Sequence, residues 1–217
     1  MSRPETDRIT VNTQNSIRIV SDAGTVIYVD PLGISTAPAD ADLILFTHSH
    51  YDHFSPEDVA RIKKPETRYI IPSGMKNDLE KIGIGMSSYV CMEAGDRVSV
   101  CGIYIDAVPA YNKLKPFHPR RNGWLGYVIS VDGIRIYAAG DTDALSENTS
   151  IQCDIAMVPI GGTYTMNPKE AAAFINELKP PVVIPTHYGS IVGKAADADE
   201  FAKRVDPEIE VVRKLRF

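Results

Sequence analysis

The stretch Leu43-Ile44-Leu45-Phe46-Thr47-His48-Ser49-His50-Tyr51-Asp52-His53 joins an apolar run to three of the five histidines of this 217-residue chain. The apolar run predicts a buried strand that ends at Phe46 and holds the following polar turn in place. Imidazole and carboxylate groups that converge on one point are costly to bury unless a cation compensates them. The turn therefore predicts a metal site, in preference to a solvated histidine-rich loop.

The spacing of these residues predicts ligands for two ions. Alternate side chains of an extended segment point the same way, so His48 and His50 can reach one point. Asp52 and His53 can reach a second point further along the turn. Two later residues follow apolar runs in the same manner, Asp141 after 134–137 and His187 after 182–184.

Three motifs together resemble the metallo-β-lactamase superfamily. The pattern His-x-His-x-Asp-His at 48–53 resembles its signature, Ala139-Gly140-Asp141-Thr142-Asp143 its bridging-carboxylate motif, and Pro185-Thr186-His187-Tyr188-Gly189 its last histidine motif. The segment 17–31 resembles the N-terminal strands of that family. Within the superfamily, the chain looks most like the small single-domain hydrolases near ascorbate-6-phosphate lactonase and N-acyl-phosphatidylethanolamine phospholipase D.

The resemblance implies an α+β fold, a four-layer αββα sandwich with the metal site at one edge between two sheets. It also implies the ligands: His48 and His50 for the first metal, Asp52, His53 and His187 for the second, and Asp141 as the bridge. The expected cofactors are two divalent metal ions, with zinc favoured over manganese or iron.

The third ligand of the first metal departs from the family pattern. The family usually has a histidine just after the strand that here ends at Val108, and Asn112 stands at that place. Either His118 reaches the metal from the loop, or the amide oxygen of Asn112 does so, or the site stays open. We expect His118, because imidazole is the better ligand for a transition metal.

The chemistry expected of two such ions is hydrolysis by a metal-bridging hydroxide, with Asp52 as the catalytic residue that orients it and carries a proton. The expected substrate is a small, anionic ester, lactone or phosphodiester, because the loop 111–121 carries four cationic side chains. The candidate substrate contacts are Asn112, Arg120, Tyr164 and Tyr188. Arg120 can instead solvate a surface loop, Tyr164 can belong to a plain turn, and Tyr188 can be a packing residue.

The periodicity predicts one domain, 1–217, that alternates strands and helices. Strands are predicted at 17–20, 25–29, 43–46, 68–71, 97–100, 102–108, 125–131, 134–138, 155–158, 182–184 and 209–213. Helices are predicted at 56–64, 75–82, 168–178 and 195–204. Ser55-Pro56 and Asn167-Pro168 supply a capping side chain followed by a proline for two of these helices.

Composition limits the compartment and the partners. The formal net charge of −5 argues against a broad nucleic-acid surface, since phosphate binding needs clustered basic residues. A polar N-terminus and the lack of a long apolar run argue against export and membrane insertion. Cys91, Cys101 and Cys153 are expected to be buried, reduced thiols of a cytoplasmic protein, although a disulfide between the first two is an alternative.

Three other functions compete with a small-molecule hydrolase. The same scaffold supports nucleases, which usually carry an added nucleic-acid clamp. It also supports di-iron oxygen or nitric oxide reductases, which bring an acidic residue where this chain has His50. A metal-binding protein without turnover is the third alternative.

Overall fold

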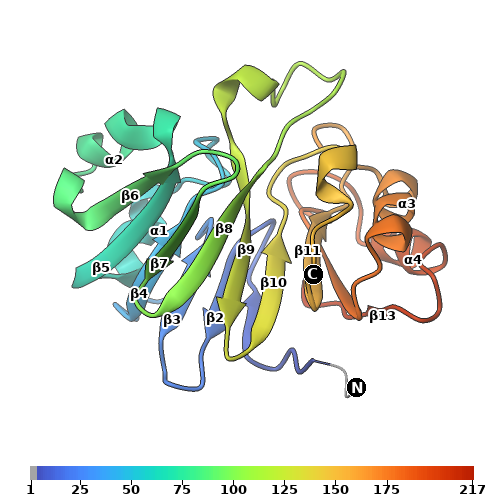
Figure 1. Ribbon diagram of the computed structural model, residues 1–217, viewed down its shortest axis with the longest axis horizontal. Coiled ribbons are helices and arrows are strands. Elements are labelled where there is room, and N and C mark those ends of the chain that lie inside the picture. Colours follow the sequence, from blue (N-terminus) through green and yellow to red (C-terminus); the bar gives the residue numbers. More distant parts are fainter. Residues whose placement is uncertain (1–3) are drawn as a thin grey trace.

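Two β-sheets lie face to face with helices on both outer faces, as the computed structural model shows for residues 4–217 (Figure 1). The first sheet has the order β1-β2-β3-β4-β5-β6. Its strands are β1 (Ile9–Val11), β2 (Ile17–Val20), β3 (Val26–Val29), β4 (Ala41–Leu45), β5 (Lys63–Pro72) and β6 (Tyr89–Met92). Strands β3 to β6 run parallel to one another, so their carboxyl ends lie at one end of the sandwich.

The second sheet has the order β13-β12-β11-β10-β9-β8-β7. Its strands are β7 (Arg97–Val100), β8 (Ile103–Pro109), β9 (Leu125–Val131), β10 (Ile134–Ala138), β11 (Ile155–Pro159), β12 (Val182–Thr186) and β13 (Glu210–Val211). Strands β10 to β13 are parallel, and β8 points the same way because two antiparallel pairings separate it from β10. The loops after β8, β10, β11 and β12 therefore meet at one edge.

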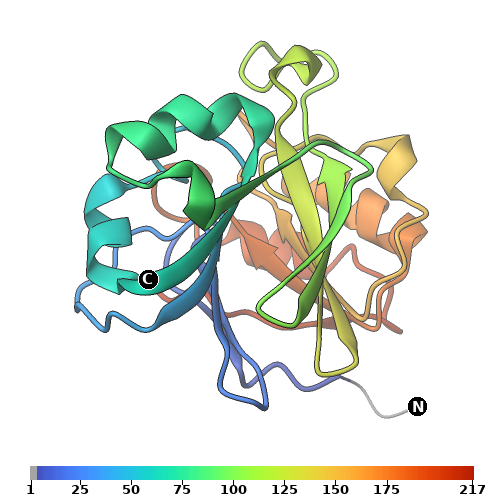
Figure 2. The same ribbon diagram turned by 60° about the vertical axis from the view of Figure 1, so that its left-hand side comes forward.

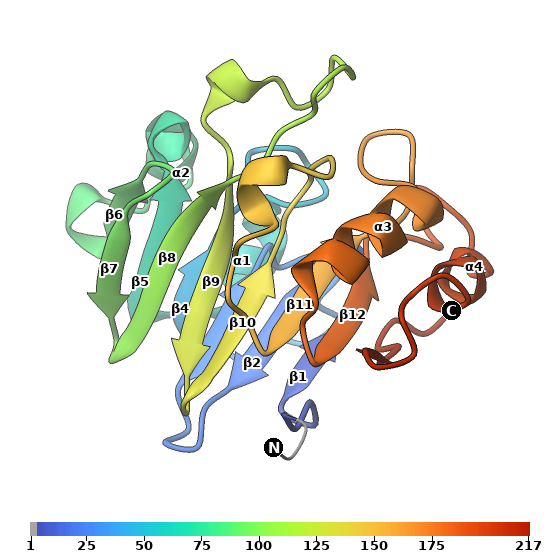
Figure 3. The same ribbon diagram turned by 45° about the vertical axis from the view of Figure 1, so that its right-hand side comes forward.

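Four α-helices form the outer layers: α1 (Pro56–Ile62), α2 (Lys76–Lys81), α3 (Pro168–Leu178) and α4 (Asp197–Ala202). The first two cover the first sheet, and the last two cover the second (Figures 2 and 3). Four short 3₁₀ turns complete the elements: η1 (Ser73–Met75), η2 (Met86–Ser88), η3 (Arg120–Asn122) and η4 (Ser146–Asn148). The helix starts follow the predicted caps, since the Ser55 hydroxyl accepts from Asp58 N and Asn167 forms a capping box with Glu170. The αββα architecture is confirmed.

The main core fills the space between the sheets and continues under α3 and α4. Along β2 and β8, buried side chains alternate with more exposed ones. Strands β4, β11 and β12 are buried almost throughout, as expected for central strands. The two sheets are joined at the edge that carries the turn 48–53: Leu125 N donates to Thr47 O, and the Tyr127 hydroxyl donates to Phe46 O. The turn after β4 is thus fixed against the second sheet.

The structure corrects several details of the sequence-based expectations. Strands β1 and β6 were missed, β13 is shorter than the predicted 209–213, and residues 63–64 of the predicted helix 56–64 begin the long strand β5. All three cysteines are free, but Cys101 is exposed in the turn between β7 and β8, and Cys91 and Cys153 are half-buried, so their predicted burial is wrong. Within residues 4–217, no helix is long and apolar enough to cross a bilayer.

Candidate metal centre

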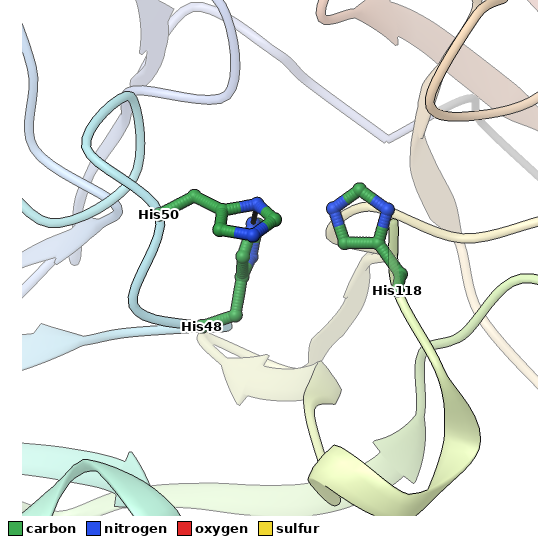
Figure 4. A group of neighbouring side chains, drawn as sticks. All are labelled: His48, His50 and His118. Carbon is green, nitrogen blue, oxygen red and sulfur yellow. Dashed lines mark hydrogen bonds between the residues drawn. The ribbon is translucent and has the colours of Figure 1, made fainter. Parts of the chain in front are cut away.

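The first group of candidate ligands consists of His48, His50 and His118, whose ligand nitrogens lie within 4.8 Å of one another (Figure 4). His48 and His50 come from the turn after β4, with 3.1 Å between His48 Nε2 and His50 Nδ1. His118 faces them from the loop between β8 and β9. The structure therefore brings His118 within reach of His48 and His50.

The second group consists of Asp52, His53 and His187, which are also within 4.8 Å of one another. His187 Nε2 lies 3.3 Å from Asp52 Oδ2 and 3.2 Å from His53 Nε2. His187 follows β12 with a positive φ of 54°, and its backbone N donates to Gln14 O. Residues separated by more than 130 positions thus meet at one point.

Asp141 lies between the two groups and turns one carboxylate oxygen toward each. Its Oδ2 is 3.2 Å from His118 Nε2, and its Oδ1 is 3.3 Å from both His53 Nε2 and His187 Nε2. A carboxylate that faces two sets of ligands in this way can bridge two cations. All five histidines of the chain belong to this cluster.

The charges of the cluster are strongly perturbed. Burial, reinforced by His53, holds the pKa of His48 well below its usual value, so His48 is neutral and keeps a free lone pair. Burial alone would raise the pKa of Asp141, but His187 and His53 outweigh it and lower that pKa well below the usual range. Burial would likewise lower the pKa of His53, but Asp141 and Asp30 raise it well above normal. The ionised carboxylate of Asp141 is therefore balanced by the protonated imidazole of His53, whose proton a bound cation would displace.

The donor atoms fit a pair of transition-metal ions. Within the described part of the chain, 4–217, His118 Nε2 and Asp141 Oδ1 are buried and have no hydrogen-bond partner. Such atoms cost free energy unless another partner satisfies them. Imidazole nitrogens with a few carboxylates suit zinc, iron or manganese, whereas a calcium site would present mainly oxygens.

A carboxylate outside the cluster orients two of its members. Asp30 Oδ2 lies 2.7 Å from His53 Nδ1 and accepts from the Thr47 hydroxyl at 2.6 Å, while its Oδ1 accepts from Thr47 N. Thr47 Oγ1 in turn lies 3.0 Å from His48 Nδ1. Such contacts leave the Nε2 atoms to face the metal. Asp30 was not predicted as a site residue, although it follows the apolar run of β3 as His48 and Asp141 follow theirs.

Asn112 supports His118. Its Oδ1 accepts from His118 N at 3.2 Å and lies 3.1 Å from His118 Nδ1, while its amide nitrogen donates to Asp143 Oδ1 and Tyr164 O. Lys115 also pairs with Asp143, at 2.6 Å. Asn112 therefore holds the loop so that His118 Nε2 points at Asp141.

The single tryptophan, Trp124, packs on the first histidine group. Its ring centroid lies 4.8 Å from that of His48, 4.7 Å from that of His50 and 5.4 Å from that of His118. Trp124 was not predicted to belong to the site. Because the chain has no other tryptophan, its fluorescence reports on this group alone.

A cavity of about 190 Å³ opens beside the cluster. Its lining residues are His50, Tyr51, Asp52, Phe117, His118, Asp141, Tyr164 and Ile191. Of the candidate substrate contacts, Tyr164 lines this cavity. Arg120 lies over the Tyr111 ring and pairs with Glu147 at 3.7 Å, and Tyr188 is buried against Phe217. A substrate role for Arg120, Tyr188 or Asn112 stays a prediction.

Comparison with known proteins agrees with the geometry. The family described as "Beta-lactamase superfamily domain" matches residues 8–187. The chain belongs to the metallo-β-lactamase superfamily. Among superfamily members, a UPF0173 metal-dependent hydrolase from Thermococcus onnurineus is 36% identical over 178 residues, 80% of this chain and 78% of the relative. The chain is therefore a member of the UPF0173 family of metal-dependent hydrolases.

Two solved structures share the fold. A protein from Parabacteroides distasonis, assigned as a metal-dependent hydrolase, has a TM-score of 0.78 at 30% identity and covers 96% of this chain and 93% of that one. CmlA, a diiron β-hydroxylase from Streptomyces venezuelae, has a TM-score of 0.76 at 17% identity, covering 100% of this chain and 55% of that one. The second likeness shows a common fold alone.

Proposed function

We propose that this protein is a dinuclear metal hydrolase whose resident ions are zinc. The observation that carries the proposal is the position of Asp141, with one oxygen toward each histidine group. His48, His50 and His118 would hold one ion, Asp52, His53 and His187 the other, and Asp141 both. Because CmlA is described as a diiron protein on this fold, iron belongs in the metal test beside manganese.

Two divalent ions held there supply Lewis acidity, which lowers the pKa of water and polarises the scissile group. The chain contributes position and proton transfer. Asp52 lines the cavity next to His50 and His118, where its carboxylate can orient the attacking water and then accept its proton. Burial would raise the pKa of Asp52, but the hydrogen bond from His187 and the charge of His53 lower it, so the group is ionised at neutral pH.

The proposed substrate is a small ester, lactone or phosphodiester. The resemblance of the sequence to the lactonase and phospholipase D groups supports lactones and phosphodiesters as the first compounds to test. A negative charge on the reacting group would be met by the ions. None of the residues that line the cavity is lysine or arginine.

The test is hydrolysis of bis(p-nitrophenyl) phosphate, p-nitrophenyl acetate and a small lactone by protein loaded with zinc, manganese or iron. We expect turnover of at least one compound, its loss after chelation and its recovery when metal is added back. Asp52→Ala should lower kcat by a factor of about 10³ or more, since it removes both a ligand and the proton acceptor. Glu177→Gln, an exposed change on α3, is the matched control.

Two results would contradict the proposal. One is hydrolysis that survives complete removal of metal. The other is near-normal kcat in Asp52→Ala with its metal content intact.

A further inference from the structure

The mouth of the candidate metal centre is apolar. Large apolar side chains that are strongly exposed within residues 4–217 are Tyr51, Met86, Tyr104, Leu114, Phe117, Ile191 and Phe217. Three of these seven, Tyr51, Phe117 and Ile191, line the same cavity. Exposed apolar side chains that gather around a concave site mark a binding surface more often than scattered ones do.

Four separate loops contribute the apolar side chains that line this cavity. Tyr51 comes from the turn after β4, Phe117 from the loop after β8, Tyr164 from the loop after β11 and Ile191 from the loop after β12. The rings of Phe117 and Tyr164 meet edge to face with their centroids 4.6 Å apart. The other residues that line the cavity are the candidate ligands His50, Asp52, His118 and Asp141.

None of the four basic side chains of the loop 111–121 lines the cavity. Lys115 Nζ pairs with Asp143 and donates to Thr165 O, and Arg120 pairs with Glu147. The part of a substrate that lies beyond the scissile bond therefore meets apolar side chains and no fixed cation.

We propose that Tyr51, Phe117, Tyr164 and Ile191 form a subsite for one aryl ring or a short acyl chain attached to the scissile group. The whole cavity, including the part beside the candidate ligands, has a volume of about 190 Å³, so only a compact apolar group fits next to the reacting group. The subsite rests on the proposed function, since the candidate ligands in the same cavity would bind the reacting group. Its substrates are compact, with a neutral apolar group beside the ester or phosphodiester.

The test compares two ligands that differ only in that group. Phenylphosphonate and methylphosphonate are titrated calorimetrically into zinc-loaded protein, with metal content measured for each preparation. We expect the phenyl compound to bind about tenfold more tightly, because its ring is withdrawn from water. Ile191→Ser and Tyr164→Ala should each reduce this preference to about threefold or less. Leu114→Ser, an exposed change outside the cavity, should leave it at about tenfold.

Hydrolysis gives a second measurement that separates the two proposals. Bis(p-nitrophenyl) phosphate and methyl p-nitrophenyl phosphate share a leaving group, so the ratio of their kcat/KM values should follow the same preference. Preferential binding of phenylphosphonate without hydrolysis of any compound supports the subsite and counts against the hydrolase. Equal binding of the two phosphonates, no binding of either, or a preference unchanged in both Ile191→Ser and Tyr164→Ala overturns the subsite.

Discussion

The carboxylate of Asp30 controls which nitrogen His53 presents to the cluster. Asp30 is fully buried, and its two carboxylate oxygens contact His53 Nδ1, the Thr47 hydroxyl and Thr47 N. The carboxylate accepts without donating, so these three neighbours must act as donors toward it. His53 Nε2 then faces Asp141 and His187, where a bound metal would displace its proton. Burying the charge of Asp30 costs free energy, which the hydrogen bond from Asn15 and the ion pair with His53 offset.

Asp30→Asn should weaken metal binding by about 10–100-fold, because the amide presents a donor where its neighbours also donate. The measurement is the dissociation constant of zinc, by competition with a chromophoric chelator. Asp40→Asn, which changes a carboxylate paired with Arg18 away from the cluster, is the control. Equal affinities in Asp30→Asn and wild type would show that Asp30 does not orient His53.

Replacing His118 and replacing Asn112 should have different effects on metal binding. His118→Ala should lose one metal per chain, since it removes a ligand nitrogen. Asn112→Ala should keep both metals at saturation, with about 10–100-fold weaker affinity for one of them, because it removes only the support of His118. Metal analysis together with Trp124 fluorescence measures both effects. Full metal content and activity in His118→Ala, with both lost in Asn112→Ala, would reverse the assignment.

Among the elements, β8 depends on a carboxylate that links three strands. Asp106 on β8 accepts from Arg97 on β7 and from Arg135 on β10. Burial would raise the pKa of Asp106, but these two guanidinium groups outweigh it and lower the pKa. A lowered pKa in the folded protein means that the carboxylate stabilises the fold while it is ionised.

Asp106→Asn should lower the free energy of unfolding by about 1 kcal/mol at pH 7, because both arginines are partly exposed and solvent screens the pairs. The stabilisation by Asp106 is present above the ordinary aspartate pKa of about 4 and is lost as the pH falls through the lower pKa of the folded protein. Urea unfolding between pH 3 and 7 measures the difference. A difference between wild type and variant that stays constant over this range would contradict the role of the charge.

The elements were more predictable than the site that they hold. Long apolar or alternating runs such as 125–131 gave strands with the right bounds, because their periodicity is unambiguous. Strand β1 has three residues, too few for a periodic signal, and β6 is a short, wholly apolar run whose pattern does not distinguish a strand from a buried helix. His118 was one of three options, since the loop 110–119 is held at the cluster by contacts of Asn112 and Lys115 with distant residues, which spacing along the chain does not encode.

At the scale of the whole molecule, the site exists only where the two sheets meet. The turn 48–53 belongs to the first sheet, whereas His118, Asp141 and His187 follow strands of the second. The family motifs in the sequence predicted this convergence, because each motif follows a buried strand. They did not predict the apolar wall of the cavity, since its four side chains are contributed singly by four loops.

The central claim is that the chain holds two metal ions through a shared Asp141. The most direct test is the number of metal ions bound per chain. It is measured for the wild type and for Asp141→Asn after each purified protein has been loaded with zinc and unbound zinc has been removed. The account predicts two zinc ions per chain in the wild type and fewer in Asp141→Asn. A wild type that binds no zinc, manganese or iron, or an Asp141→Asn variant that retains two ions with unchanged affinity, would contradict it.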